Sequence, residues 1–369
     1  MNAIIGKPRR TAGLFAAGAA TLLLVLTGCG GSDDQSSTGS STSAAAQAPA
    51  DVPFTGSAEN DLPTGYPEPE PADNELAFLT VAASNEFMKA VGDAMAAEAE
   101  RLGGSSITFD ANLDANTQVT QFQQALAQGI DGLFVNAADN KALAPMLKQA
   151  EKQGVPVIGL GVTQSGTDRA DLEGLTSQIW ESREKQAYLQ VKELTSHVDE
   201  GAPIAQITSS LPIPVVQVFS EYQRKWAEEF GLDIVGSAES GGDGIPDGEE
   251  AMTGLLAQYP DIQGLLPYND PVGIGAGAAA RAQGKRDFPI VGTNGGSDAL
   301  AAIASGRLTA TVKIDAVSIG RFATMGLYDA IAGEKIDATV LSGEPIVVTQ
   351  DNVAEIKSWQ DEIAALPAG

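Results

Sequence analysis

The chain has 369 residues, with 48 Asp and Glu against 22 Lys and Arg, and a formal net charge of −26. A surface this acidic repels phosphate backbones, so nucleic acid is excluded as a natural partner. The single cysteine excludes an internal disulfide, and the single histidine leaves no His- or Cys-based metal site or catalytic triad. We therefore predict no catalytic residues, no metal and no cofactor.

The first 28 residues have the layout of a secretory signal, with three basic residues followed by an uncharged apolar run. The run is shorter than the roughly 20 apolar residues of a membrane-spanning helix. It ends at Leu26-Thr27-Gly28-Cys29, which is similar to a bacterial lipobox. We predict that Cys29 is lipidated and holds the protein at the extracytoplasmic face of the cell membrane. The alternative is a soluble secreted protein with a chance cysteine after its signal.

Residues 29–72 are rich in Ser, Thr, Ala, Gly, Asp and Pro and contain no Lys or Arg. Such a composition buries too little apolar surface to offset the entropy of ordering. We predict a disordered tether, which leaves residues 73–369 as the folded body.

In the body, short apolar runs with strand propensity alternate with stretches of helical spacing. Met88, Val91 and Met95, for example, fall on one helix face. The expected strands are residues 76–82, 106–109, 132–135, 155–160, 203–208, 234–235, 262–266, 288–291, 309–314 and 345–348. Repeated strand–helix units predict an α/β fold with doubly wound parallel sheets. Ligands of such sheets lie beyond the carboxyl ends of the strands.

An asparagine follows four of these expected strands: Asn85, Asn136, Asn269 and Asn294. An amide offers two donors and an acceptor on one plane, which suits hydroxyls that both donate and accept. The alternative is that each asparagine caps the helix that follows it. The two roles are compatible, and the repetition at four strand ends favours a ligand site for polyhydroxylated molecules.

Several segments, in this order and spacing, resemble the ribose-binding-protein family, the type I periplasmic sugar-binding proteins that feed ABC importers. The resemblance covers about residues 75–355. It rests on Asn85-Glu-Phe-Met, Gln128-Gly-Ile-Asp-Gly-Leu-Phe-Val-Asn136, Gly154-Val-Pro-Val-Ile, Tyr259-Pro-Asp-Ile, Tyr268-Asn-Asp270, Ile290-Val-Gly-Thr-Asn294-Gly and Ser305-Gly-Arg-Leu-Thr-Ala-Thr.

The resemblance implies two lobes joined by three crossings, near residues 175–177, 314–315 and 341–344. The N-terminal lobe would comprise residues 73–176 and 315–342, and the C-terminal lobe residues 177–314 and 343–369. A ligand would be enclosed between the lobes by a hinge motion. The implied protein is a monomer, and its partner is an ABC permease.

The resemblance also implies which residues face the ligand. The asparagines would hydrogen-bond to it, and Phe87 and Met88 would stack on its apolar face. Beyond the resemblance, we expect Trp180 to add stacking surface, with core or hinge packing as the alternative. The expected ligand-binding residues are Asn85, Phe87, Met88, Asn136, Trp180, Asn269, Asp270 and Asn294.

The sequence departs from the family pattern at several ligand-gripping positions. Gly161 and Val162 stand where the family usually has Asp-Arg, and residues 212–220 lack an expected arginine. Ile314 replaces a common Gln, and Ser177-Gln178 replaces Asp-Asn. Each missing hydrogen bond removes about 1 kcal/mol. We therefore expect a neutral polyhydroxylated ligand that is less polar or larger than ribose, such as a modified sugar or a polyol.

One alternative function and two sequence segments remain to be considered. A receptor that signals to a membrane sensor would use the same closed cleft, so it stands as the alternative to import. The acidic turn at residues 243–250 suggests calcium weakly and a helix start more strongly. Gly273-Ile-Gly-Ala-Gly277 is a poor match to a dinucleotide loop, and close helix packing explains it better.

Overall fold

The structure, a computed structural model, describes residues 52–56, 62–161 and 173–367. These residues belong to one compact unit, residues 46–369. The expected signal sequence and Cys29 lie outside the described residues. Within those that are described, no helix has the length and apolar character needed to cross a membrane.

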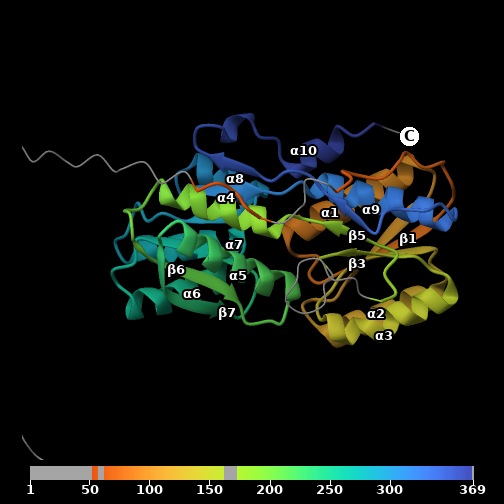
Figure 1. The fold of residues 1–369 in the computed structure, drawn as a ribbon, viewed down its shortest axis with the longest axis horizontal. Coiled ribbons are helices and arrows are strands. Elements are labelled where there is room, and N and C mark those ends of the chain that lie inside the picture. The colour runs from red at the N-terminus through yellow and green to blue at the C-terminus, as the bar shows by residue number, and fades with distance from the viewer. Residues whose placement is uncertain (1–51, 57–61, 162–172, 368–369) are drawn as a thin grey trace, which may run out of the picture. The chain divides into compact units, whose positions relative to one another are not determined.

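The first lobe is built on a six-stranded parallel sheet in the order β11-β5-β4-β3-β1-β2. Its strands are β1 (Glu75–Thr80), β2 (Ser105–Asp110), β3 (Gly132–Asn136), β4 (Val157–Leu160), β5 (Ser177–Trp180) and β11 (Thr339–Leu341). Its helices are α1 (Glu86–Arg101), α2 (Ala115–Gln128), α3 (Asn140–Gln153) and α9 (Ala316–Ile331). Along β1, Phe78 packs with α1 and α9 while its neighbours Ala77 and Leu79 pack with α2 and α3. Both faces are therefore covered (Figure 1), which explains the nearly continuous apolar strands.

The second lobe joins two three-stranded sheets, β7-β6-β8 and β12-β10-β9. A parallel bridge between Leu265 and Ile290 connects them, and β12 runs antiparallel to β10. The strands are β6 (Pro203–Ser209), β7 (Asp233–Ser240), β8 (Gly264–Pro267), β9 (Val291–Asn294), β10 (Ala310–Lys313) and β12 (Ile346–Thr349). The helices are α4 (Arg183–Thr195), α5 (Pro214–Glu229), α6 (Ile245–Gln258), α7 (Asp270–Ala282) and α8 (Ser297–Ala304). The predicted α/β class with parallel sheets is confirmed.

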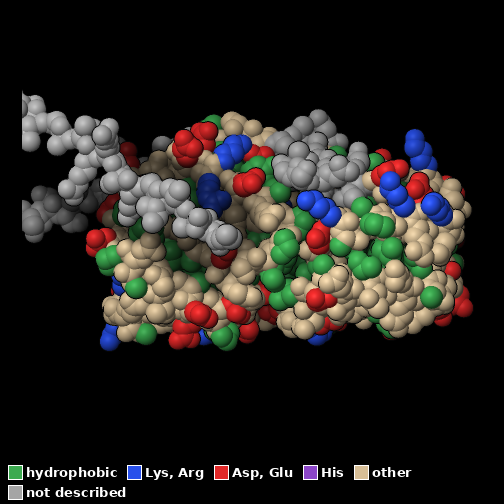
Figure 2. Space-filling model, turned by 90° about the horizontal axis from the view of Figure 1, so that it is seen from below, with side chains coloured by type: hydrophobic (Ala, Val, Ile, Leu, Met, Phe, Trp, Pro, Cys, Tyr) green, Lys and Arg blue, Asp and Glu red, His purple; other side chains and the backbone are tan. Residues whose placement is uncertain are grey.

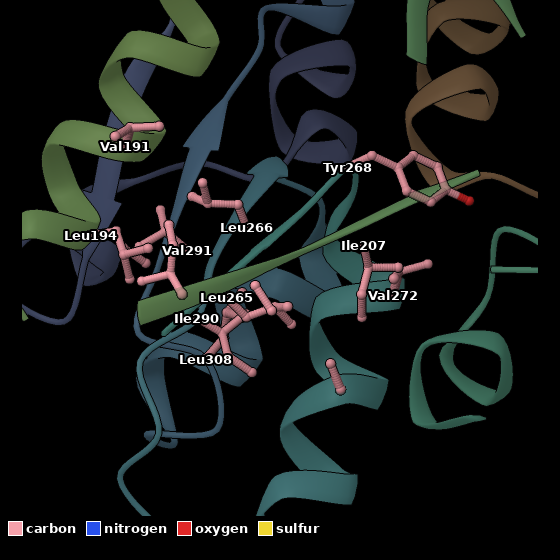
Figure 3. Packing of buried hydrophobic residues seen from close by; sticks show 14 of the residues in the cluster. Val191, Leu194, Ile207, Leu265, Leu266, Tyr268, Val272, Ile290, Val291 and Leu308 are labelled. Carbon is pink, nitrogen blue, oxygen red and sulfur yellow. The ribbon is translucent and has the colours of Figure 1, made fainter. Parts of the chain in front are cut away.

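The core of the second lobe is continuous across the bridge. Val191 and Leu194 of α4 lie on one side beside Val291, and Ile207 of β6 faces Val272 of α7 on the other (Figure 3). Helices α6 and α7 approach closely, since a Cβ added to Gly275 would lie 1.9 Å from the carbonyl oxygen of Ile245. The Gly273–Gly277 repeat therefore serves helix packing.

Within the described residues, the chain crosses between the two sheets three times. The chain passes between the sheets after β10 and again between β11 and β12. Strand β5, however, pairs with β4 and β11 in the first sheet. The first crossing therefore follows Trp180, and the lobe boundary expected at residue 176 was placed too early. Strand β5 has four residues and begins with polar Ser177-Gln178, so its sequence gives little sign of a strand.

The predicted disordered tether is wrong for residues 52–56 and 62–72, which pack on the folded body. The ring of Phe54 lies 5.2 Å from Tyr188 and 5.7 Å from Trp226 in the second lobe. Tyr66 is buried in the first lobe, where its hydroxyl lies 2.7 Å from Ser177 Oγ. Aromatic residues thus give this polar segment enough apolar contact to be ordered.

The C-terminal helix α10 (Trp359–Ala364) follows a short 3₁₀ turn, η2 (Val353–Glu355). We expected residues 343–369 to belong to the C-terminal lobe, but Trp359 is buried in the core of the first lobe, with Ile363 and Leu366 packed against it. Figure 1 shows α10 in dark blue between α8 and the pair α1 and α9. Helix α10 therefore contacts residues of both lobes.

Candidate ligand-binding cleft

Residues from both lobes line one small cavity of about 60 Å³. Six of the eight expected ligand-binding residues take part: Asn85, Phe87, Met88, Asn136, Asn269 and Asn294. The other lining residues are Val81, Ala82, Leu113, Arg183, Ile213, Val215, Val216, Asp243 and Tyr268. The strand ends and helix starts that carry the asparagines therefore converge. A cavity of this size has space for a few water molecules only.

Asn85 and Asn269 cap helices and also reach into the cleft. Asn85 accepts hydrogen bonds from the backbone N–H groups of Phe87 and Met88, and Asn269 accepts one from Val272. Their free amide groups point the other way: Asn85 Nδ2 donates to Asp243 Oδ2 at 2.5 Å, and Asn269 Nδ2 donates to Asp243 Oδ1. Capping and cleft contact coexist, so neither interpretation of these asparagines excludes the other.

Asp243 is a cleft residue that sequence reasoning assigned to an acidic turn. Burial raises the pKa of its carboxyl, while hydrogen bonds from Asn85, Tyr268 and Asn269 oppose that rise. Its partners lie 158 and 26 residues away in the chain. No local pattern signals such contacts. Asp243 thus accepts hydrogen bonds from both lobes, from Asn85 of the first and Asn269 of the second.

Asn136 lines the cavity, and its Oδ1 is buried. Among the described residues, this oxygen has no hydrogen-bond partner. The side chain is 1% exposed, and its Nδ2 donates to Leu160 O at 3.2 Å. This bond fixes the amide plane and leaves Oδ1 as an unused acceptor. An unsatisfied buried acceptor costs about 1–3 kcal/mol, which a donor on a bound molecule would recover.

Asn294 lines the cavity with an unusual backbone, φ 112°, at the end of β9. Positive φ is uncommon for residues other than glycine, although asparagine tolerates it better than most. Asp270 holds the loop after β9 in place. Its carboxylate accepts hydrogen bonds from Gly295 N at 2.6 Å and from Thr311 Oγ1 at 2.7 Å. Asp270 does not line the cavity; it supports the loop that presents Asn294.

Trp180 is also absent from the cavity lining. It is 2% exposed at the end of β5, where the chain first leaves the first lobe. The charged residue that reaches the cavity from this region is Arg183, which lies 2.7 Å from Glu181 and 3.3 Å from Gln186. Sequence reasoning noticed that an arginine was missing from residues 212–220 but did not see that Arg183 occupies the cleft.

An apolar cluster closes the lobes against each other beside the polar groups. Val81 and Ala138 from the first lobe pack with Ile213 from the second, and Val215 and Val216 extend the contact. The residues that replace the expected arginine thus form an apolar wall. The cleft combines neutral amides, one carboxylate, one paired guanidinium and apolar surface.

The aspartates of the acidic turn at residues 243–250 contact other groups of the protein. Asp247 Oδ2 accepts a hydrogen bond from Gly244 N at 3.0 Å at the start of α6, while Asp243 faces the cleft. In the described part of the chain, no group of three or more His, Cys, Asp or Glu side chains is placed to hold a metal ion.

The fold defines a class: two-lobed α/β proteins with the type I periplasmic binding protein fold. The match to the periplasmic binding protein domain covers residues 76–335. The chain therefore belongs to the periplasmic binding protein domain family, a family of substrate-binding proteins.

Relatives of known name and structure agree with this assignment. The ribose import binding protein of Bacillus subtilis is 26% identical over 75% of this chain and 90% of its own length. That of Escherichia coli is 24% identical over 76% and 92%. A solute-binding protein from Actinobacillus succinogenes with bound D-allose superposes with a TM-score of 0.69 at 20% identity, over 77% and 100% of the two chains. One from Bacillus halodurans with bound myo-inositol gives 0.67 at 24%, over 78% and 98%.

Proposed function

We propose that this chain is the extracytoplasmic binding lipoprotein of an ABC importer and that it captures a neutral sugar or polyol between its lobes. The observation that carries the proposal is Asn136, which lines a cavity between both lobes and whose buried Oδ1 has no partner among the described residues. A ligand hydroxyl is a donor of the right kind for it.

The charges of the cleft favour a neutral ligand. Arg183 is paired with Glu181, and the amides of Asn85 and Asn269 surround Asp243. An anionic ligand would have to separate Arg183 from Glu181 and would lie near the carboxylate of Asp243, which is costly. The apolar wall at Ile213 favours a ligand with an apolar face, such as a modified sugar or a cyclic polyol.

Import is the role that relatives support. The relatives from B. subtilis and E. coli are named as ribose import binding proteins, and one from Paraburkholderia graminis, 24% identical, as a D-apiose import binding protein. The permease of such an importer is the partner expected here. The signalling alternative has no comparable support.

The ligand class can be tested with a thermal-shift panel of D-ribose, D-allose, D-apiose, D-fucose, myo-inositol and glycerol. A ligand at 100 times its dissociation constant stabilises the folded state by about 2.7 kcal/mol. We expect at least one sugar or cyclic polyol to raise the melting temperature. Mass spectrometry of the natively purified protein would reveal a ligand outside the panel. If no neutral polyhydroxylated compound binds or co-purifies, the proposal is wrong.

The site itself is tested by Asn136→Ala, because this change removes the unused acceptor. We expect the dissociation constant of the best panel compound to rise about tenfold, the equivalent of about 1.4 kcal/mol. Loss of the bond to Leu160 should lower stability by about 1 kcal/mol only. Asn116→Ala, an exposed asparagine on α2, is the matched control and should bind as the wild type does. If both variants bind the compound with equal affinity, Asn136 is not part of the binding site.

A further inference from the structure

Helix α10 lies beyond residues 76–335, the part of the chain that matches the family. Its first residue, Trp359, is 1% exposed. A six-residue helix at a chain end normally frays unless it is tied down by contacts. The surroundings of Trp359 show what ties it down.

Trp359 contacts a ring that lines the ligand cavity. Its centroid lies 5.7 Å from that of Phe87 at an interplanar angle of 56°. Phe87 is 3% exposed and belongs to the first turn of α1, directly after the capping Asn85. The indole therefore limits where the Phe87 ring can lie without touching the cavity itself.

The same indole is bonded to a chain crossing. Trp359 Nε1 donates to Ile314 O at 3.0 Å, and Lys313 Nζ lies 5.7 Å from the ring centroid. Lys313 ends β10 of the second lobe, and Ile314 begins the crossing into α9 of the first. Trp359 thus joins the cavity wall to the hinge.

Helix α10 also contacts the start of α8 in the second lobe. Ser297 Oγ lies 3.1 Å from Gln360 Oε1, and a Cβ added to Gly296 would lie 3.4 Å from Cζ3 of Trp359. Lys313 Nζ donates to Glu362 Oε1 at 3.0 Å. Beside these contacts, Glu86 of α1 accepts a hydrogen bond from Ser297 N at 2.8 Å. These bonds join elements of opposite lobes.

From these contacts we infer that α10 is a clasp that holds the two lobes together in the absence of ligand, with Trp359 as the positioning residue that transmits lobe closure to Phe87. When the lobes separate, the contacts of α10 with Gly296 and Ser297 must break while its packing on the first lobe persists. The clasp therefore lowers the free energy of the closed form alone. Only the link to Phe87 rests on the proposed function.

The test is Trp359→Phe in the mature full-length chain, which keeps an aromatic ring beside Phe87 but removes the donor to Ile314. Small-angle X-ray scattering without ligand should show a larger radius of gyration than for the wild type. The dissociation constant of D-ribose, or of whichever panel compound binds, should rise about three- to tenfold, as expected for one lost hydrogen bond.

Trp226→Phe is the matched control, since Trp226 is equally buried in the second lobe and its Nε1 has no hydrogen-bond partner among the described residues. It should lower the melting temperature without changing the radius of gyration or the affinity. The clasp is overturned if Trp359→Phe scatters as the wild type does, or if the ligand-free wild type is already open. If no panel compound binds, the proposed function fails while scattering still decides the clasp.

Discussion

At the scale of single residues, the asparagines show how far sequence reasoning reaches. Their places at strand ends predicted that Asn85, Asn136, Asn269 and Asn294 would converge, and all four line one cavity. Asp243 was missed because its role depends on Asn85, which approaches from the other lobe. Strand ends can be found from local pattern, whereas a contact between lobes depends on how two separate sheets face each other.

Asp270 makes a prediction about pH. Burial raises the pKa of its carboxyl to about 7, against the hydrogen bonds from Thr311 and Gly295 that lower it. The folded state therefore binds this proton more tightly than the unfolded state does, and the resulting stability is complete below pH 4 and lost as pH rises through 7. Between pH 5 and pH 8 the loss should amount to a few kcal/mol at most.

Asp270→Asn removes the titrating group, so the variant should lose less stability than the wild type over the same range. Urea unfolding at pH 5, 6, 7 and 8 measures the difference. Asp233→Asn, at an exposed carboxylate, controls for the general effect of removing one charge from an acidic protein. Parallel curves for the wild type and Asp270→Asn would show that Asp270 does not titrate in this range.

At the scale of elements, length and apolar content decided which strands could be predicted. Long runs such as the one containing β1 were found, whereas β5 has four residues and starts with Ser177-Gln178, and β11 has only three. Both become strands because a neighbouring strand offers hydrogen bonds, as β4 does for β5. Such pairing is a property of the assembled sheet and leaves little trace in the sequence.

The segment before β1 gives a second prediction. Tyr66→Phe removes the hydroxyl contact with Ser177 and should lower the free energy of unfolding by about 1 kcal/mol. Tyr66→Ala also removes the buried ring and should cost about 3 kcal/mol or more. Glu70→Ala, an exposed neighbour, should change it by less than about 0.5 kcal/mol. Denaturant unfolding measures all three, and equal stability of the Ala variants would mean that the segment is not part of the folded body.

At the scale of the whole molecule, the acidic charge fits attachment by an acyl chain. Figure 2 shows acidic side chains spread over one face, with the basic ones in separate groups. Such a surface is repelled by anionic lipid headgroups. If Cys29 carries the anchor, Cys29→Ala expressed with the signal intact should move from the membrane fraction to the soluble fraction, with unchanged ligand affinity. A variant that stays with the membrane would rule out lipidation as the means of attachment.

The small volume of the cavity has a consequence for kinetics. If this cleft binds a sugar as proposed, the two halves must part to make room for it, because the 60 Å³ between them holds only a few water molecules. Capture would then proceed more slowly than unhindered encounters, and its observed rate would level off as solute becomes abundant. The rate of uptake would then be limited by the rate at which the protein opens and not by how often solute collides with it.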